Sequence, residues 1–499
     1  MAGKQMNRRN VTIAMMVATF LAAIEVTIVS TAMPRIASDL GGLELISWVY
    51  AVYLLTTAVT TPIYGKLADL FGRKIIFTIG AIVFLIGSML CGLSDSMEQL
   101  IWFRALQGIG AGAVLPVTFT IIGDIYTFEE RAKIQGWFSS IWGISGIVGP
   151  LVGGFFVDQL SWHWIFFINV PFGIISIIML WMYLEESFEK KKKHIDYAGV
   201  VTFTIGMTAL LYAFLTGGQQ YAWNSSSIIG LFVVAVVFLA VFIRVELKSP
   251  EPMLPLSLFK IRTISVSNTA SLLLSALLIA MNAYLPMWVQ GVYGKGATSA
   301  GLILTPMSIG WPLGAILCGR LILSIGARRT SLIGITILLA ASLWLATVSI
   351  ATPQLVLTLI MFVAGLGFGL SITVFTVVVQ SSVDWSLRGA ATASNSFLRT
   401  LGQACGIAVF GTLFNSALSG YMSGNRVPAG DMNQLLNPET ARLLPPGIVA
   451  VMREGLASSL HQVFLTLFFL AGAALLITLF LPRKNPGVAG AGKPAAEQK

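Results

Sequence analysis

Two charged residues lie inside apolar stretches of this sequence, where an ordinary solvated side chain is hard to place. Glu25 stands in FLAAIEVTIVSTAMP, residues 20–34, and Arg104 stands in WFRALQGIGAGAVLP, residues 102–116. An ionisable side chain in an apolar helix is unfavourable unless it faces a cavity or a partner, and such groups mark ion and proton pathways. A carboxyl group in that setting can take up and release a proton.

Each of these two residues also has a simpler explanation. Arg104 lies about one turn from the end of its stretch, so its side chain could extend to the membrane interface. Glu25 could be a structural carboxylate that an arginine satisfies without any proton chemistry. The choice depends on the elements that carry the two side chains.

Composition places these stretches in an integral membrane protein. Of the 499 residues, 56% are hydrophobic and only 10% are charged, and the mean hydropathy is +0.84. Soluble domains carry about 25% charged residues, so a soluble protein this apolar could not cover its surface. The start, MAGKQMNRRN, precedes an apolar stretch of near span length, which favours a retained first span over a cleaved signal peptide.

A spanning helix needs about 20 mostly apolar residues, and the sequence contains fourteen such stretches, long and continuous rather than alternating as in a β-barrel. We expect the spans at Val11–Ala32, Ile46–Tyr64, Ile75–Leu93, Leu100–Ile122, Ile134–Val157, Trp164–Leu184, Tyr197–Leu215, Ser227–Val245, Ile264–Val289, Ala300–Leu321, Ser331–Ile350, Leu355–Val379, Phe397–Leu418 and Val463–Leu481.

The placement of lysine and arginine supports this count. With the N-terminus inside, the inner segments hold most of these cations, including the run Lys190–Lys193. The outer segments hold only Arg35, Lys295, Arg426, Arg442 and Arg453. A miscount by one span would reverse the bias halfway along the chain. The sequence therefore predicts a multi-pass protein of the cell membrane with both termini cytoplasmic.

The loops divide the chain into two six-span bundles and an insert. A charged linker at 185–196 and a proline-bearing linker at 248–262 enclose two short spans. The expected parts are an N-terminal bundle over 1–186, a two-helix insert with its cytoplasmic linkers over 187–256, and a C-terminal bundle over 257–482 with a long outer loop at about 419–462. A disordered tail over 483–499 follows from its Gly, Ala and Lys content.

A short charged motif, GKLADLFGRK at residues 65–74, follows the second span. Its glycines allow a tight inner turn, and its charges can join neighbouring helix ends. The residues expected to form an inner latch are Gly65, Asp69, Gly72, Arg73, Lys74 and, at the end of span four, Asp124. A partial echo, GRLILSIGARR at 319–329, follows the tenth span and favours a repeated half. An ordinary basic loop is the alternative.

The fifth span, WGISGIVGPLVGGFF at residues 142–156, is dense in small residues. Such residues favour close helix packing, and a proline removes one backbone donor and favours a bend. The residues of interest are Gly143, Gly146, Gly149, Pro150, Gly153 and Gly154. Close packing alone would also explain them.

Patterns for cofactors are missing from the sequence. His163, His194 and His461 are scattered, so no metal site is indicated. No G-x-x-x-x-G-K-[ST] loop occurs, so ATP is not the expected energy source. No feature indicates a nucleic-acid partner.

Together these motifs resemble those of the major facilitator superfamily. GKLADLFGRK and WFRALQGIGAG resemble its inner-loop and fourth-span signatures, and WGISGIVGPLVGG resembles the fifth-span signature of its antiporters. FLAAIEVTIVSTAMP, SWHWIFFINVPFG and YLPMWVQGVYGKGATSAGLILTP are similar to segments of the fourteen-span drug:proton antiporters of the QacA/EmrB type. That family usually has Asp where this chain has Glu25.

The resemblance implies a mechanism. Spans one and four are neighbours in the family, and Glu25 and Arg104 lie at similar depth in the outer half of the membrane. Burial favours the neutral carboxyl group and a nearby arginine favours the ionised one, so a balanced group can load and lose a proton. A lipophilic cation competes for the same charge. We therefore expect proton-coupled export of lipophilic, often cationic drugs by alternating access, with the proton gradient as energy source and no cofactor.

The expected substrate cavity includes Glu25, Trp142, Asn282 and Tyr284. The expected partners are small lipophilic molecules, protons and the lipid bilayer, and the expected functional unit is a monomer. A proton-coupled exporter of one metabolite, peptide or lipid would use the same fold. A non-transporting sensor would usually carry a soluble output domain, and a membrane enzyme would need a catalytic constellation; the sequence displays neither.

Overall fold

A computed structural model describes residues 7–126, 128–186, 196–218, 220–250, 252, 254, 256–383, 387–425 and 429–483. Within these ranges, fourteen helices are long and apolar enough to cross a membrane. The predicted all-α membrane fold and the number of spans are therefore confirmed. The linker at 187–195 and the tail from residue 484 onward lie outside the described residues.

The first six spans form one bundle. Its helices are α1 (Arg8–Leu40), α2 (Ile46–Phe71), α3 (Arg73–Cys91), α4 (Met97–Ile125), α5 (Phe128–Gln159), and the pair α6 (Trp164–Phe167) and α7 (Asn169–Tyr183), with a 3-10 turn η1 (Leu43–Leu45) between α1 and α2. Helix α1 packs on α4, α5 and α7, while α4 also packs on α2 and α3. Helix α1 is therefore central to this half.

The insert consists of α8 (Tyr197–Thr216) and α9 (Ser226–Glu246), and the remaining helices form the second bundle. That bundle contains η2 (Leu256–Lys260), α10 (Arg262–Met287), the π-helical segment η3 (Trp288–Val292), α11 (Ala297–Ser324), α12 (Ala327–Ala346), α13 (Gln354–Ser381), α14 (Arg388–Asn425), α15 (Ala429–Leu435), α16 (Pro438–Ala441) and α17 (Pro446–Thr478).

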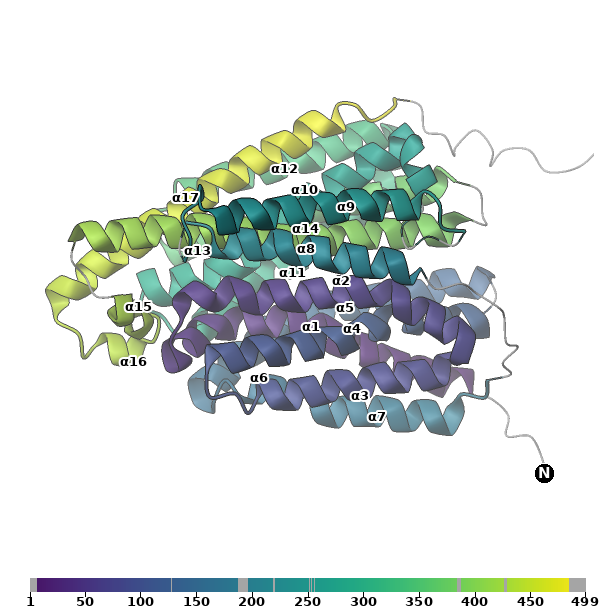
Figure 1. Cartoon of the computed structure of the whole chain (residues 1–499), viewed down its shortest axis with the longest axis horizontal. Coiled ribbons are helices and arrows are strands. Elements are labelled where there is room, and N and C mark those ends of the chain that lie inside the picture. Colours follow the sequence, from purple (N-terminus) through teal and green to yellow (C-terminus); the bar gives the residue numbers. More distant parts are fainter. Residues whose placement is uncertain are drawn as a thin grey trace, which may run out of the picture.

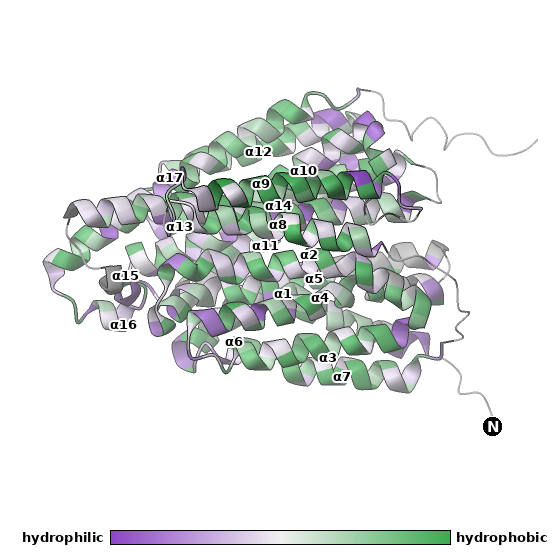
Figure 2. Cartoon of the chain, in the orientation of Figure 1, coloured by the Kyte–Doolittle hydropathy of each residue, from purple (hydrophilic) through white to green (hydrophobic). Residues whose placement is uncertain are grey.

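The two bundles lie side by side, with the short helices α15 and α16 at one end of the molecule (Figure 1). They meet where α5 packs on α11 and α2 packs on α14, and the insert helix α8 packs on α14 and α2. Figure 2 shows hydrophilic residues gathered toward the helix ends and hydrophobic residues along the middle. We refer to the end that carries α15 and α16 as the α15 end.

The predicted outer loop at about 419–462 is mostly helical, which corrects that expectation. Helix α14 continues to Asn425 and α17 already begins at Pro446, seventeen residues before the predicted span. Met452, Leu456 and Leu460 recur every fourth residue and are fully buried. This spacing places one apolar stripe of α17 against the bundle, although polar neighbours lower the local hydropathy.

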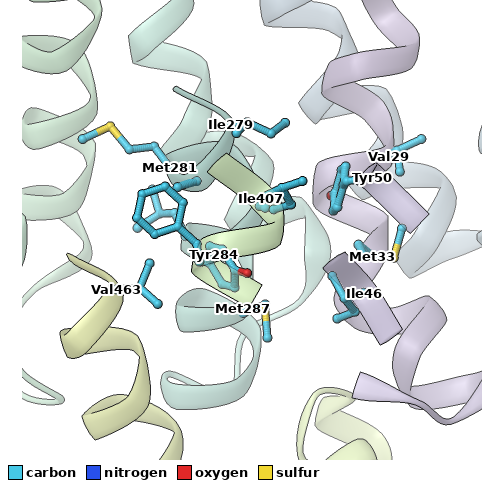
Figure 3. Close-up of a cluster of buried hydrophobic side chains, with 14 of the residues drawn as sticks. Val29, Met33, Ile46, Tyr50, Ile279, Met281, Tyr284, Met287, Ile407 and Val463 are labelled. Atoms are coloured by element: carbon cyan, nitrogen blue, oxygen red, sulfur yellow. The ribbon is translucent and has the colours of Figure 1, made fainter. Parts of the chain in front are cut away.

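Hydrogen bonds join the two bundles at the α15 end. They run between Ser47 and Tyr284 hydroxyls (3.1 Å), from the Gln290 amide to the Thr31 carbonyl (2.8 Å), from the Asn415 amide to the Glu44 carbonyl (2.8 Å), and from the Leu43 N–H to the Asn433 side chain (3.0 Å). Figure 3 shows an apolar layer beside them, in which Met33, Ile46 and Tyr50 face Ile407 and Tyr284. The bundles are closed on each other at this end.

A carboxylate adds to this closure. Asp158, at the end of α5, accepts hydrogen bonds from the N–H groups of Ala297 (3.0 Å) and Thr298 (2.8 Å) in the first turn of α11. A negative charge at a helix N-terminus is stabilised by the exposed N–H groups and the helix dipole. The contact therefore favours the state in which the α15 end is closed.

We expect Asp158→Asn to open the α15 end, because the neutral amide loses the interaction with the helix dipole. The open population should rise about fivefold, corresponding to about 1 kcal/mol. Spin labels at the exposed positions 160 and 443, one in each bundle, would report the distance distribution in reconstituted protein. Asp39→Asn is the control, because Asp39 pairs with Arg35 within α1. Equal distributions for both variants would contradict the assignment.

Candidate functional site

Glu25 of α1 and Arg104 of α4 form an ion pair inside the first bundle. The exposed fraction of Glu25 is 0% and that of Arg104 is 1%, and Nη1 of Arg104 donates to Oε1 of Glu25. The close packing of α1 on α4 brings the two charges together. A fully desolvated pair is stable only if further hydrogen bonds satisfy its remaining polar atoms.

Arg104 has two additional partners. Nη1 also donates to Oε1 of Gln107, three residues further along α4, at 2.7 Å. The guanidinium group lies over the ring of Tyr53 from α2, 3.9 Å from its centroid. A cation over an aromatic face is attracted by the negative face of the ring, most strongly where water is excluded.

The second oxygen of Glu25 is held by α7. The side-chain amide of Asn169 donates to Oε2 of Glu25 at 2.7 Å and to Oγ of Ser88 at 2.9 Å. Ser88, on α3, donates in turn to the Phe166 carbonyl of α6 at 2.8 Å. Side chains of α4 and α7 therefore contact the carboxylate of α1 directly, and α3 and α6 hold Asn169 in place through Ser88.

Sequence reasoning missed the residues around the pair. Asn169 lies within SWHWIFFINVPFG, near the start of the predicted span Trp164–Leu184, and an amide inside an apolar span is itself a signal for a functional partner. Gln107 follows Arg104 by three residues on one helix face, so the i,i+3 spacing could have found it. Ser88 and Tyr53 come from other helices, and only the packing of those helices places them here.

The ion pair has no access to solvent in this conformation, since the exposed fraction of Glu25 is 0% and that of Arg104 is 1%. A cavity of about 20 Å³ lies elsewhere along α1, lined by Ala18, Leu21 and Ala22 and by side chains of α3, α4 and α7. It has room for about one water molecule, and neither member of the pair lines it. Proton exchange at Glu25 therefore requires a rearrangement of the helices.

In this conformation, three of the four residues expected to line the substrate cavity are buried. Tyr284 is 1% exposed and is bonded to Ser47, while Asn282 is 9% exposed and donates to the Leu278 carbonyl of its own helix. Glu25 is fully enclosed as well. Of the four residues, only Trp142 on α5 has substantial exposed surface, at 42%. The closed contact between the bundles buries α10, which carries Asn282 and Tyr284.

The charged motif after the second span lies where α2, α4 and α7 end and α3 begins. Gly72 separates α2 from α3 with φ of 95°, a conformation that glycine adopts without strain. Nε of Arg73 lies 2.6 Å from Oδ2 of Asp124. The N–H groups of Arg73 and Lys74 donate to the carboxylate of Glu186 at 2.7 and 3.1 Å.

The remaining members of the expected latch differ in their surroundings. Nζ of Lys74 donates to the carbonyls of Leu184 (2.8 Å) and Trp181 (3.1 Å). A side chain at Gly65 would meet open space, so packing does not require glycine there. The side chain of Asp69 lies outside the described part of the structure. Glu186, which the latch prediction did not include, binds the first turn of α3.

The glycines of α5 divide between two faces. A Cβ atom at Gly149 or Gly153 would meet Thr27, Ile28 or Thr31 of α1, whereas one at Gly146 or Gly154 would meet Ser308 or Thr298 of α11. The backbone oxygen of Pro150 lies against Gly301 of α11. Helix α5 therefore packs closely on the helix that carries Glu25 and on the second bundle at once.

Two six-helix bundles that meet along paired helices define a multi-pass membrane protein with a transporter fold. The family model described as Major Facilitator Superfamily matches residues 15–407, and the chain belongs to this family. The resemblance inferred from the motifs is confirmed at this level.

Two relatives match nearly the whole chain. Multidrug resistance protein 3 of Bacillus subtilis (strain 168) is 37% identical over 490 residues, 96% of this chain and 96% of that protein. Multidrug transporter protein MdtP of the same organism is 37% identical over 508 residues, 96% of this chain and 94% of that protein. Both are described by name as transport or resistance proteins.

Solved structures match the fold at low identity. A bacterial homolog of the human lysosomal transporter Spinster, in an inward-facing and unoccupied conformation, is similar with a TM-score of 0.67 and 16% sequence identity. The match covers 95% of this chain and 97% of that one. A likeness at this identity supports the fold alone.

Arg104→Gln is expected to destabilise the protein by about 3–5 kcal/mol, because an uncompensated carboxylate remains buried. Thermal unfolding in detergent measures the loss. The double variant Glu25→Gln with Arg104→Gln should recover most of the stability, and an equal loss in both variants would contradict the pairing.

Gly154→Ala and Gly143→Ala form a matched pair on α5. The new Cβ at position 154 would lie 2.5 Å from the backbone Cα of Thr298, whereas at position 143 the nearest atom is Cγ of Pro312 at 3.7 Å. We expect Gly154→Ala to cost about 1–3 kcal/mol of stability through overpacking and Gly143→Ala to be tolerated. Thermal unfolding distinguishes them, and equal melting temperatures would argue against a tight α5–α11 contact.

Proposed function

We propose that this chain is a proton-coupled antiporter that exports lipophilic, often cationic, structurally diverse compounds by alternating access. The observation that carries the proposal is the fully buried carboxylate of Glu25, paired with Arg104 in the middle of a membrane-spanning bundle. The two Bacillus relatives, a multidrug resistance protein and a multidrug transporter, support the substrate class.

The chemistry follows from the charge balance of the pair. With Glu25 ionised, Arg104 has a counter-ion and the helices pack as described. When Glu25 binds a proton, Arg104 becomes an uncompensated buried cation. Such a cation destabilises the packed state by several kcal/mol. Protonation therefore weakens the packing of α1 on α4 and favours a different arrangement of the bundles. The closed α15 end with an intact ion pair corresponds to the state after proton release.

Coupling to the substrate runs through α1. Because Glu25 is enclosed in this state, a cationic substrate acts on it through the position of α1 rather than by direct contact. Helix α1 packs on α5 and also touches α10 and α11 of the second bundle. A shift of α1 on protonation thus reaches the surfaces along which the bundles meet, and these surfaces enclose the substrate path in alternating access.

The surroundings of the antiporter complete the proposal. It would act as a monomer in the cell membrane, with both termini on the cytoplasmic side and the α15 end outside. Its substrates would be small lipophilic molecules and its energy source the proton gradient, without cofactor, nucleic acid or enzymatic turnover. Drug would leave the cytoplasm or inner leaflet while a proton enters.

Glu25→Gln is expected to abolish pH-driven export of ethidium from proteoliposomes, to the level of protein-free liposomes, because the amide keeps the shape but cannot exchange a proton. Glu25→Asp retains the charge and should keep coupled exchange. Ethidium binding, followed by tryptophan fluorescence, serves as the folding control for both variants.

Full pH-driven exchange by Glu25→Gln would refute the role of Glu25. A resistance panel in cells, with and without an uncoupler, tests the breadth of export. Protection against a single compound, in place of many, would favour a dedicated metabolite exporter of the same fold.

A further inference from the structure

The joint between α6 and α7 contains a side-chain amide whose nitrogen has hydrogen-bond partners and whose oxygen has none among the described residues. Asn169 is the first residue of α7, next to the turn at Ile168 that separates the two helices, and it is fully buried. Both hydrogens of its amide nitrogen have acceptors, on Glu25 and on Ser88. Its Oδ1 atom is buried without a hydrogen-bond partner among the described residues. A buried acceptor without a donor is destabilising.

The state of Glu25 decides whether this arrangement fits. An ionised carboxylate only accepts hydrogen bonds, so the N–H of Asn169 suits it. A protonated Glu25 carries a hydrogen on one oxygen and needs an acceptor there. With the hydrogen on Oε2, the amide nitrogen would face it donor to donor. Turning the Asn169 amide by half a rotation would present Oδ1 instead, and would move its two N–H groups to the side where Oδ1 now lacks a partner.

We propose that Asn169 is a positioning residue that turns its amide as Glu25 binds and releases its proton, and so transmits the protonation state to the joint between α6 and α7. The inference rests on proton binding at Glu25, as proposed above. The proton arrives on Oε2 of Glu25 and leaves from there, and Asn169 changes only which end of its amide faces the carboxyl group.

Ser88 carries the change one step further. In the described state its hydroxyl donates to the Phe166 carbonyl in α6 and accepts from Asn169. After the turn, the second lone pair of Oδ1 can accept a hydrogen bond from the Ser88 hydroxyl. Ser88 then no longer donates to the Phe166 carbonyl. Helix α6 follows closely on Asp158, the carboxylate that binds α11. The joint therefore lies between the proton site and the closed α15 end.

Asn169→Ala tests the proposal in full-length protein reconstituted in proteoliposomes. The hydrogen bond to the ionised carboxylate is stronger than the one to the protonated group, so its loss makes the proton harder to release. We expect the pH midpoint of ethidium–proton exchange to move by about one pH unit toward alkaline pH, which is tenfold in proton affinity.

Asn395→Ala is the matched control. Asn395 is also a buried amide in a spanning helix, 2% exposed, and donates to Asn268 at 2.8 Å and to Ser271 at 3.2 Å, away from Glu25. A structural loss of the same kind without contact to the carboxylate should leave the pH midpoint unchanged. Equal midpoints for Asn169→Ala and the wild type would overturn the proposal.

Infrared difference spectra of the wild-type protein test the turning step without relying on a variant. Isotope labelling of the asparagine side-chain carbonyl identifies its band in spectra recorded between acidic and alkaline pH. We expect a labelled band that changes together with the carboxylic-acid band, and that persists in Asn395→Ala but is lost in Asn169→Ala. A carboxylic-acid band without any change in the asparagine band would overturn the turning step.

The two levels of the hypothesis fail differently. If Glu25→Gln retains full coupled exchange, proton binding at Glu25 is refuted, and the role of Asn169 with it. If Glu25→Gln is uncoupled while Asn169→Ala keeps the wild-type midpoint and the asparagine band stays constant, only the role of Asn169 is refuted.

Discussion

A carboxylate and a guanidinium group without access to water constrain everything around them. Neither charge can be left alone in the bundle, since an uncompensated buried ion is disfavoured by several kcal/mol. Glu25 therefore needs Arg104, while Asn169 donates to the second oxygen of Glu25 and Gln107 accepts from the Nη1 atom of Arg104 that also binds Glu25. The packing of α1 against α4 and α7 meets this requirement, because it brings these partners to the pair. Any change in the charge of Glu25 therefore changes the stability of that packing.

The sequence was sufficient for the spans and for the central pair of charges. Long apolar stretches and the bias of Lys and Arg depend on local composition, so all fourteen spans were found. The helical segment before residue 463 was missed, because Met452, Leu456 and Leu460 are separated by polar residues that lower the hydropathy of α17. Local composition measures how apolar a segment is and not which of its faces is buried.

The partners of the pair show where sequence reasoning ends. Arg104 was identified because a charge in a span is conspicuous. Serine and tyrosine are common in membrane helices, so only tertiary packing shows that Ser88 and Tyr53 belong to the site. The substrate-cavity role of Tyr284 stays a prediction. Its hydroxyl is hydrogen-bonded to Ser47 across the contact between the bundles, and a sequence does not specify which arrangement of the two bundles a structure will hold.

Helix α5 has a further consequence for the energetics of switching. At Gly149 and Gly154 the helix presents backbone instead of a side chain, toward Thr27 on one side and Thr298 on the other. Interlocked surfaces must separate before they can change register, whereas smooth ones can glide past each other with a low barrier. The α5 contacts with α1 and α11 therefore offer little side-chain interlocking to a sliding motion. A lower barrier of this kind raises the rate at which two arrangements of the bundles exchange and leaves their relative populations unchanged.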